Sequence, residues 1–176
     1  MPPPTLTGRA YCATCHDGPD GPGPRLDIQT AAYLHAQLDA YRSGARPSGI
    51  MAQAVSLVPR ESFAALADAF AGEAAPRTPP PGDGDGAGED LARRGTRDVP
   101  ACLACHGGDS RKGPALTGQS RAFLATQLRL WRDGTLGHDP LMTAAARDLT
   151  DADIALLAAY FSGTGRGAPG NNPPAR

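Results

Sequence analysis

The chain has 176 residues, a net charge of −1 and a hydrophobic fraction of 40%, values that suit one globular domain or two small ones. The near-neutral charge argues against a nucleic-acid binder, and no apolar run approaches the ~20 residues of a membrane helix. Aromatic residues make up only 5% of the chain, which excludes an aromatic-rich core.

The first motif along the chain is CATCH, Cys12–His16. On a short helix, cysteines three residues apart share one face, and a histidine four residues after the first cysteine lies beside it. Two thiols placed in this way can add to the two vinyl groups of a haem while the imidazole reaches the iron. The motif therefore predicts a c-type haem attached to Cys12 and Cys15, with His16 as an iron ligand.

Helical periodicity follows the motif. Apolar residues at helical spacing predict a helix over residues 34–41 that stops at Gly44 and a second helix over 63–70 that begins after Pro59. No segment alternates with the period of a strand. We therefore predict an all-α fold.

The segment between residues 73 and 90 consists mainly of proline, glycine and acidic residues, a composition typical of an exposed linker. We predict four parts: an N-terminal domain over 1–75, a Pro/Gly-rich linker over 76–90, a C-terminal domain over 91–167 and a flexible tail over 168–176.

The C-terminal part repeats the N-terminal part. A shift of 90 residues places Cys102, Cys105 and His106 on Cys12, Cys15 and His16, Pro114 on Pro24, Trp131 on Tyr41 and Arg132 on Arg42. Gly134 is the equivalent of the helix stop at Gly44, and Thr150 is the equivalent of the helix start at Pro59. Domains of about 75 residues have marginal hydrophobic cores, and a haem would supply each with a large apolar surface. The repeat predicts two tandem class I cytochrome c-like domains with one covalently attached haem each.

Other uses of the cysteines fit less well. Two CxxC pairs of one zinc site usually lie ~15–20 residues apart, whereas here the linker separates them, and His35 and His138 are not equivalent in the repeat. A redox-active CxxC expects a βαβ context, and disulfides give no reason for two histidines. Haem attachment explains both cysteines and the histidine of each motif.

Two methionines occupy matched positions, Met51 and Met142, which follow His16 and His106 by 35 and 36 residues. We predict that each is the sixth iron ligand, so that the metal ligands are His16, Met51, His106 and Met142. His138 is a rival ligand for the second haem. A neutral thioether raises the reduction potential, and two filled axial positions favour electron transfer.

Further matched pairs suit supporting roles around the haems. The carbonyl groups of Pro24 and Pro114 can accept a hydrogen bond from the ligating histidine and orient its ring. We also predict that Tyr41 and Trp131 pack on the haem edges and that Arg42 and Arg132 pair with haem propionates, with ordinary core packing and exposed arginine as the alternatives.

These motifs resemble the dihaem cytochromes c of the c4 type, built from two class I-like cytochrome c domains. The likeness rests on both CxxCH motifs, the GP-x-L segments after them, the Q-x-L-x-x-[YW]-R-x-G helices, Met51 and Met142, and the closing AFAG and YFSG segments. It covers most of the chain outside the linker and tails.

The resemblance implies a periplasmic electron carrier with His/Met-ligated haems whose propionate edges meet near a pseudo-twofold domain interface. Its partners would be a dehydrogenase or quinol-oxidising complex as donor and a terminal oxidase or reductase as acceptor. No nucleic acid and no transmembrane segment are expected, and peripheral membrane association is compatible with the sequence. The first residues, MPPPTLTGRA, lack the features of a signal peptide, which we interpret as already removed.

Three alternatives to a free electron carrier are open at this point. The first is the haem-containing subunit of a dehydrogenase complex. A dihaem enzyme, such as a peroxidase or a sulfur-compound oxidoreductase, would need a displaceable sixth ligand and acid–base residues, which the sequence does not reveal. A haem-based sensor lacks an attached output domain.

Overall fold

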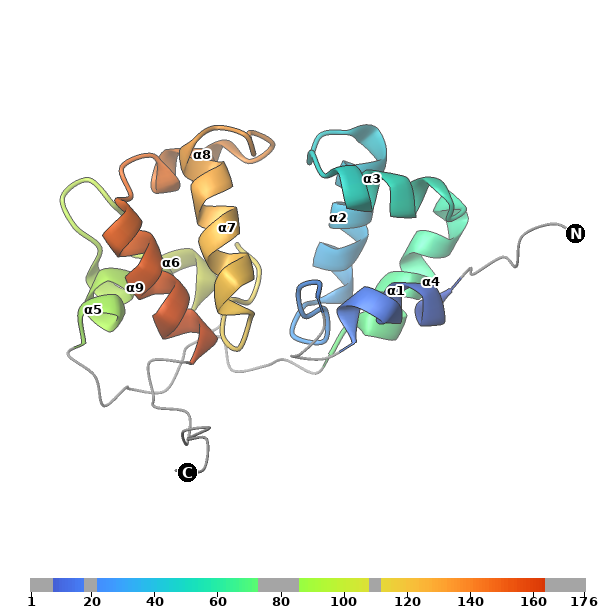
Figure 1. The fold of residues 1–176 in the computed structure, drawn as a ribbon, viewed down its shortest axis with the longest axis horizontal. Helices are drawn as coiled ribbons and strands as arrows, with labels where there is room; N and C mark the ends of the chain where they lie inside the picture. Colours follow the sequence, from blue (N-terminus) through green and yellow to red (C-terminus); the bar gives the residue numbers. More distant parts are fainter. Residues whose placement is uncertain (1–7, 18–21, 73–85, 108–111, 164–176) are drawn as a thin grey trace, which may run out of the picture.

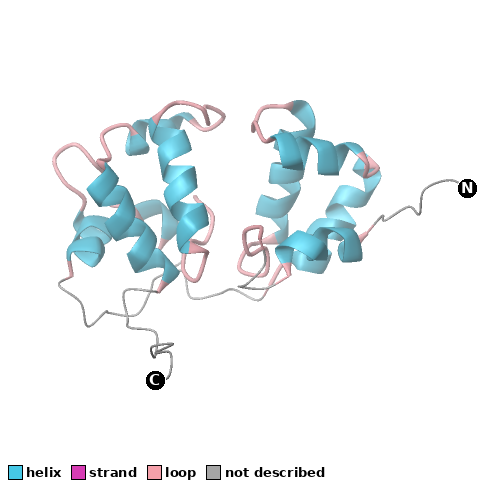
Figure 2. Cartoon of the chain, viewed as in Figure 1, coloured by secondary structure: helices cyan, strands magenta, loops and turns pink. Residues whose placement is uncertain are grey.

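The computed structural model describes residues 8–17, 22–72, 86–107 and 112–163. Within these ranges every regular element is a helix (Figure 2), which confirms the predicted all-α class. None of the described helices is long and apolar enough to span a membrane. The predicted tail and most of the predicted linker lie outside the described residues.

Two groups of helices lie side by side (Figure 1). The first group contains α1 (Arg9–His16), α2 (Ala31–Ser43), α3 (Gly49–Ser56), the short 3₁₀ helix η1 (Arg60–Ser62) and α4 (Phe63–Phe70). The second contains α5 (Ala87–Arg94), α6 (Leu103–His106), α7 (Arg121–Arg132), α8 (Pro140–Ala146) and α9 (Asp151–Ser162). In the first group α2 packs on α3 and α4, and in the second α7 packs on α8 and α9.

Side-chain caps and glycines set the helix ends. The Thr30 side chain accepts a hydrogen bond from the backbone of Tyr33 at the start of α2, and Gly44 ends that helix with φ 79°. Thr150 begins α9 in a capping box with Asp153, in which each side chain bonds the other's backbone. The helix start predicted at Thr150 and the stop at Gly44 are confirmed, because local chemistry decides both.

Equivalent residues of α4 and α9 form the centres of the two cores. Three pairs, separated by 91 positions, are all buried: Phe63 and Ile154, Leu66 and Leu157, Phe70 and Phe161. They lie on one face of each helix, at the i, i+3 and i+7 spacing on which the helix predictions rest.

Helix α5 begins at Ala87, inside the segment predicted as linker, so the predicted linker extends too far. Its sequence, AGEDLARR, places acidic residues in the first turn and arginines in the last, an arrangement that stabilises a helix through its dipole. A Cβ at Gly88 would lie 2.7 Å from the carbonyl oxygen of Leu156, so glycine permits a close crossing of α5 and α9. In the first group, the contact with α4 comes from α1, where Arg9 donates a hydrogen bond to the carbonyl of Ala69 at 3.3 Å.

Two glutamines join the groups reciprocally. Gln29 donates to the carbonyl of Ala115 (2.8 Å) and accepts from its N–H (3.0 Å), while Gln119 donates to the carbonyl of Arg25 (3.1 Å) and accepts from its N–H (2.9 Å). Residues 29 and 119 are 90 positions apart, as are 25 and 115. Each half therefore gives the other the same contact, as a pseudo-twofold relation requires.

The contacts of these two glutamine side chains predict that removing one of them lowers the stability of the protein. Gln119→Ala leaves the backbone N–H and carbonyl of Arg25 without their partner at a site where Gln119 is buried. We expect the free energy of unfolding of the holoprotein to fall by ~1–3 kcal/mol, measured by denaturant titration.

The exposed Gln53 on α3 provides the matched control, and Gln53→Ala should change the stability by less than ~0.5 kcal/mol. Equal effects of the two substitutions would show that the reciprocal amide contacts do not stabilise the folded chain.

Candidate haem-binding sites

The two CxxCH motifs lie on helical turns. Cys12, Cys15 and His16 belong to α1, while Cys102 directly precedes α6, which carries Cys105 and His106. The N–H of His106 bonds the carbonyl of Cys102 at 2.9 Å, closing the turn that brings the motif residues together. The structure therefore gives each half the helical motif geometry on which the haem prediction depends.

No disulfide bond joins any of the four cysteines. Burial raises the pKa of the Cys102 thiol to about 11 and raises that of Cys12 above its ordinary value.

Each motif histidine is oriented by a proline carbonyl. Nδ1 of His16 lies 2.8 Å from the carbonyl oxygen of Pro24, and Nδ1 of His106 lies 2.9 Å from that of Pro114. The carbonyl can only accept, so Nδ1 must carry the hydrogen and the lone pair lies on Nε2. This tautomer is the one that an iron ligand needs.

A glycine before each proline makes room for the imidazole ring. A Cβ at Gly23 would lie 2.8 Å from Cε1 of His16, and one at Gly113 would lie 2.5 Å from Cε1 of His106. Both distances are far inside van der Waals contact. The sequence shows the repeated Gly-Pro pair, but the need for glycine becomes visible only from the ring position.

The two methionines occupy the same position in their helices. Ser48 caps α3 and accepts from the N–H of Met51 at 3.3 Å, and Asp139 caps α8 and accepts from the N–H of Met142 at 3.2 Å. Both side chains are partly buried against the core of their own half. The equivalent placement supports a shared role as sixth ligand, which stays a prediction.

His138, the rival ligand, lies against Trp131 with ring centroids 4.7 Å apart. Burial, with a smaller contribution from the charge of Arg46, lowers the pKa of His138, so the ring is neutral at pH 7. Its Nδ1 is buried and has no hydrogen-bond partner within the described part of the chain.

The supporting aromatic residues pack in the two cores. Tyr41 lies against the cluster of Val55, Val58, Phe63 and Leu66, and Trp131 against the larger cluster of the second half. Both positions are compatible with contact to a haem edge and with core packing, so the predicted haem contacts remain predictions.

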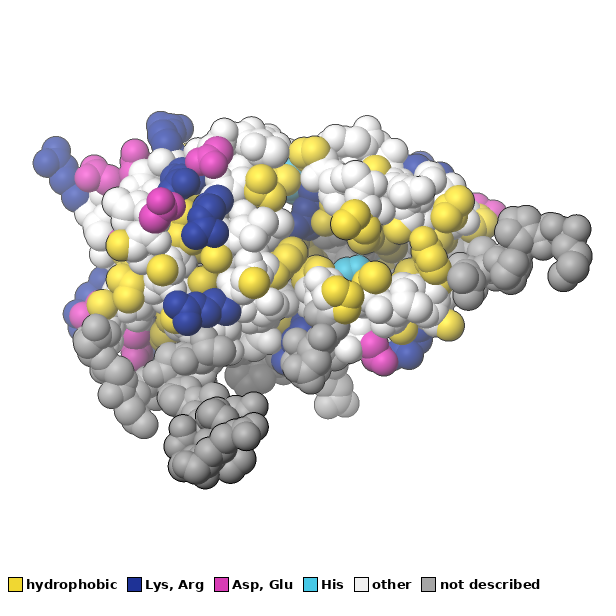
Figure 3. Space-filling view, in the orientation of Figure 1, with side chains coloured by type: hydrophobic (Ala, Val, Ile, Leu, Met, Phe, Trp, Pro, Cys, Tyr) yellow, Lys and Arg dark blue, Asp and Glu magenta, His cyan; other side chains and the backbone are white. Residues whose placement is uncertain are grey.

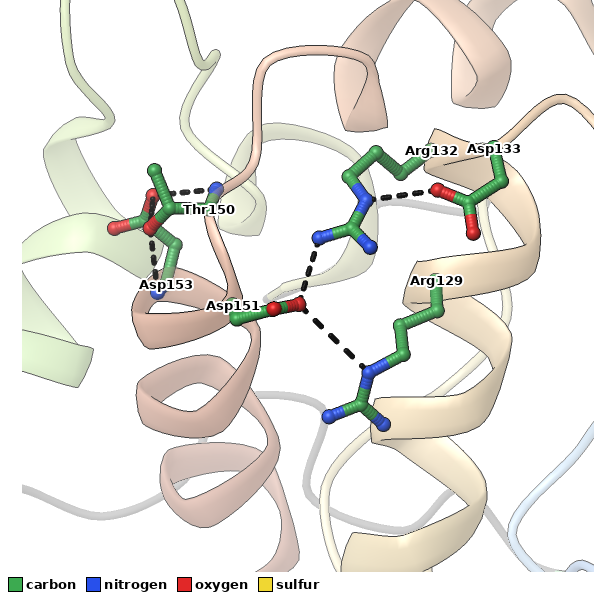
Figure 4. A network of polar contacts seen from close by, with 6 residues as sticks. All are labelled: Arg129, Arg132, Asp133, Thr150, Asp151 and Asp153. Atoms are coloured by element: carbon green, nitrogen blue, oxygen red, sulfur yellow. Dashed lines mark hydrogen bonds and ion pairs between the residues drawn. The ribbon is translucent and has the colours of Figure 1, made fainter.

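The two arginines predicted to bind propionates have protein partners. Arg42 donates to the carbonyl groups of Val55 and Val58 at the end of α3. Arg132 donates to Asp133 at 2.9 Å and to Asp151 at 2.8 Å, so that it joins α7 to the start of α9 (Figure 4). Their role toward propionates is untested, and the contacts described here are ones that sequence reasoning missed.

Charged side chains cover the second half more densely than the first on the face in Figure 3, where cationic and anionic groups are interleaved. On α5 the ion pairs Arg93–Glu89 (2.6 Å) and Arg94–Asp90 (2.9 Å) each join one turn to the next. The surface charge of α5 is thus balanced within the helix.

The donor set fits a haem in each half. Two thiols, an oriented imidazole and a thioether are the groups that attach and ligate a c-type haem, and the buried hydroxyl of Thr117, on the segment after Pro114, has no hydrogen-bond partner among the described residues. When bound, such a haem supplies an iron that takes up and releases one electron.

The role of the glycines can be tested with Gly113→Ala. The added methyl group must displace the ring of His106 from Pro114, so we expect the second haem to lose its low-spin His-ligated spectrum. Loss of a contact that orients a ligating histidine typically lowers the affinity for the metal by about tenfold or more. Absorption and EPR spectra of the purified holoprotein measure this change.

Gly137→Ala is the control, because the atom nearest to a Cβ there lies 4.0 Å away. A low-spin second haem in Gly113→Ala, identical to that of Gly137→Ala, would contradict the steric requirement.

The sixth ligand can be tested with Met142→Ala. We expect the reduced second haem to bind CO and its midpoint potential to fall, because the thioether that raises the potential is gone. CO difference spectra and redox titration give the result, with the exposed neighbour Leu141→Ala as control. An unchanged spectrum without CO binding would instead assign the ligand position to another group, such as His138.

Comparison with known proteins agrees with the predicted haem cofactor. The family model described as cytochrome c oxidase, cbb3-type, subunit III matches residues 84–161. The thiosulfate dehydrogenase electron acceptor of Stutzerimonas stutzeri is 38% identical over 172 aligned residues, which cover 88% of this chain and 79% of that protein.

Two solved structures are similar to most of this chain. A cytochrome c4 of Acidithiobacillus ferrooxidans superposes with a TM-score of 0.74 at 29% identity, covering 87% of this chain and 98% of the other. A thiosulfate dehydrogenase of Marichromatium purpuratum gives a TM-score of 0.70 at 33% identity, covering 86% of this chain and 36% of the other. With its two CxxCH motifs, this chain therefore belongs to the c4 family of dihaem cytochromes c, electron carriers with covalently attached c-type haem.

Proposed function

We propose that this cytochrome accepts electrons from a dehydrogenase that oxidises thiosulfate and passes them singly to a further redox protein. The observation that carries the proposal is the 38% identity to an electron acceptor of thiosulfate dehydrogenase over 88% of this chain. The structural likeness to 36% of the chain of a thiosulfate dehydrogenase supports it, since a c4-like part and further sequence share one polypeptide there.

The site favours a carrier over an enzyme. His16 with Met51, and His106 with Met142, are the residues that would hold the iron in each half, and a metal held by both would offer substrate no open position. Each haem then exchanges one electron with its surroundings, and a fully oxidised chain takes up two.

We also propose that the protein lies in the periplasm and meets its donor there, which its resemblance to the c4 type supports. In a bacterial host, the haem-stained band should appear in the osmotic-shock fraction. Retention of all haem-stained protein in the cytoplasmic fraction would contradict this location.

The proposed donor can be tested by mixing the oxidised cytochrome with thiosulfate and a catalytic amount of a thiosulfate dehydrogenase. We expect reduction of both haems, two electrons per chain, followed as the rise of the reduced α-band in a stopped-flow instrument. Omission of the dehydrogenase is the first control, and a quinol-oxidising complex with its quinol is the second. Rapid reduction by the quinol-oxidising complex together with none by the dehydrogenase would assign the donor to the other class.

A further inference from the structure

Arg46 is an arginine in the interior, just after α2. Its backbone N–H donates to the carbonyl of Ala40 at 3.0 Å, and only 8% of its surface is exposed. In the second half the equivalent position, 90 residues later, is Leu136, whose N–H donates in the same way to Leu130 at 3.0 Å. The backbone is thus repeated, but only the first half places a positive charge there.

The guanidinium of Arg46 bridges the two halves. It donates to Oε1 of Gln37 on α2 at 2.5 Å and to Oε1 of Gln127 on α7 at 2.7 Å. Gln37 and Gln127 are themselves equivalent in the repeat, 90 positions apart. Arg46 therefore lies where the two halves present the same side chain to each other. The ring of Tyr41 covers its other side, with the guanidinium carbon 5.0 Å from the ring centroid.

The charge of Arg46 is not neutralised by these contacts. Amide oxygens are neutral, and no carboxylate within the described residues pairs with Arg46. A guanidinium has five N–H donors, of which the two glutamines take two. An unpaired charge in the interior is strongly unfavourable, so an anion beside Arg46 would stabilise the folded holoprotein.

We propose that Arg46 is the counter-ion for haem propionates where the two halves meet, and that it raises the reduction potentials of both haems. Propionates are the anions that come with the cofactor, and guanidinium matches the geometry of a carboxylate. The proposal rests on haem loading and on no particular donor or acceptor protein.

The direction of the effect follows from charge. Oxidation of a haem iron adds one positive charge, and a nearby guanidinium disfavours this state when solvent screens it poorly. Removing the charge of Arg46 should therefore lower both midpoint potentials. The same guanidinium also holds α2 against α7, so one side chain links the contact between the halves to their electron affinity.

The test uses redox titration of the purified holoprotein, with no partner present. Arg46→Leu installs the residue that the second half carries at Leu136, and Arg46→Gln and Arg46→Lys separate charge from hydrogen bonding. We expect Arg46→Leu and Arg46→Gln to lower the reduction equilibrium constants of the haems by about tenfold, which is 59 mV for a one-electron couple. Arg46→Lys should stay close to the unsubstituted protein.

Arg60→Leu is the matched control, since Arg60 is an exposed arginine of the same half, paired with Asp39. A purely structural role of Arg46 would affect unfolding in all three variants alike and leave the potentials unchanged. Equal potentials in Arg46→Lys and Arg46→Gln overturn the proposal, and this comparison remains decisive even where Arg46→Leu does not load haem. Failure to accept electrons from the dehydrogenase would refute the proposed donor but leave this result untouched.

Discussion

The hydrogen bond from a histidine ring to a proline carbonyl is the contact on which both halves of this cytochrome depend. His16 bonds Pro24 and His106 bonds Pro114, and in each case the preceding glycine leaves space for the ring. This contact selects the tautomer with its lone pair on Nε2 and fixes the direction in which the lone pair points. The cysteines can then hold a haem at the end of the same short helix.

Local patterns in the sequence predict much of the structure. The helix stop at Gly44 and the helix start at Thr150 follow from residues that act within one turn. The repeat predicts the two haem motifs and the matched methionines, because the same residues recur at the same separations. Because the same pattern occurs twice, each copy supports the interpretation of the other. The fold class can therefore be predicted with few assumptions about contacts distant in sequence.

Features that depend on contacts distant in sequence could not be predicted. The start of α5 inside the predicted linker depends on its packing against α9, where Gly88 meets Leu156. The carbonyl partners of Arg42 follow from the position of α3. The burial of Arg46 requires both halves at once, because Gln127 comes from the second. Arginine in a loop is ordinarily exposed, so no sequence pattern marks this residue as an interior one.

The reciprocal pairing of Gln29 and Gln119 has a consequence for how such a chain could arise. Because each half presents the same groups that it receives, one half alone carries a self-complementary surface, the kind through which identical subunits form closed dimers. Joining two copies in one polypeptide converts that bimolecular association into an intramolecular one. Once association no longer depends on protein concentration, the two copies need not keep identical sequences. A charge such as that of Arg46 can then be kept on one side and replaced by Leu136 on the other.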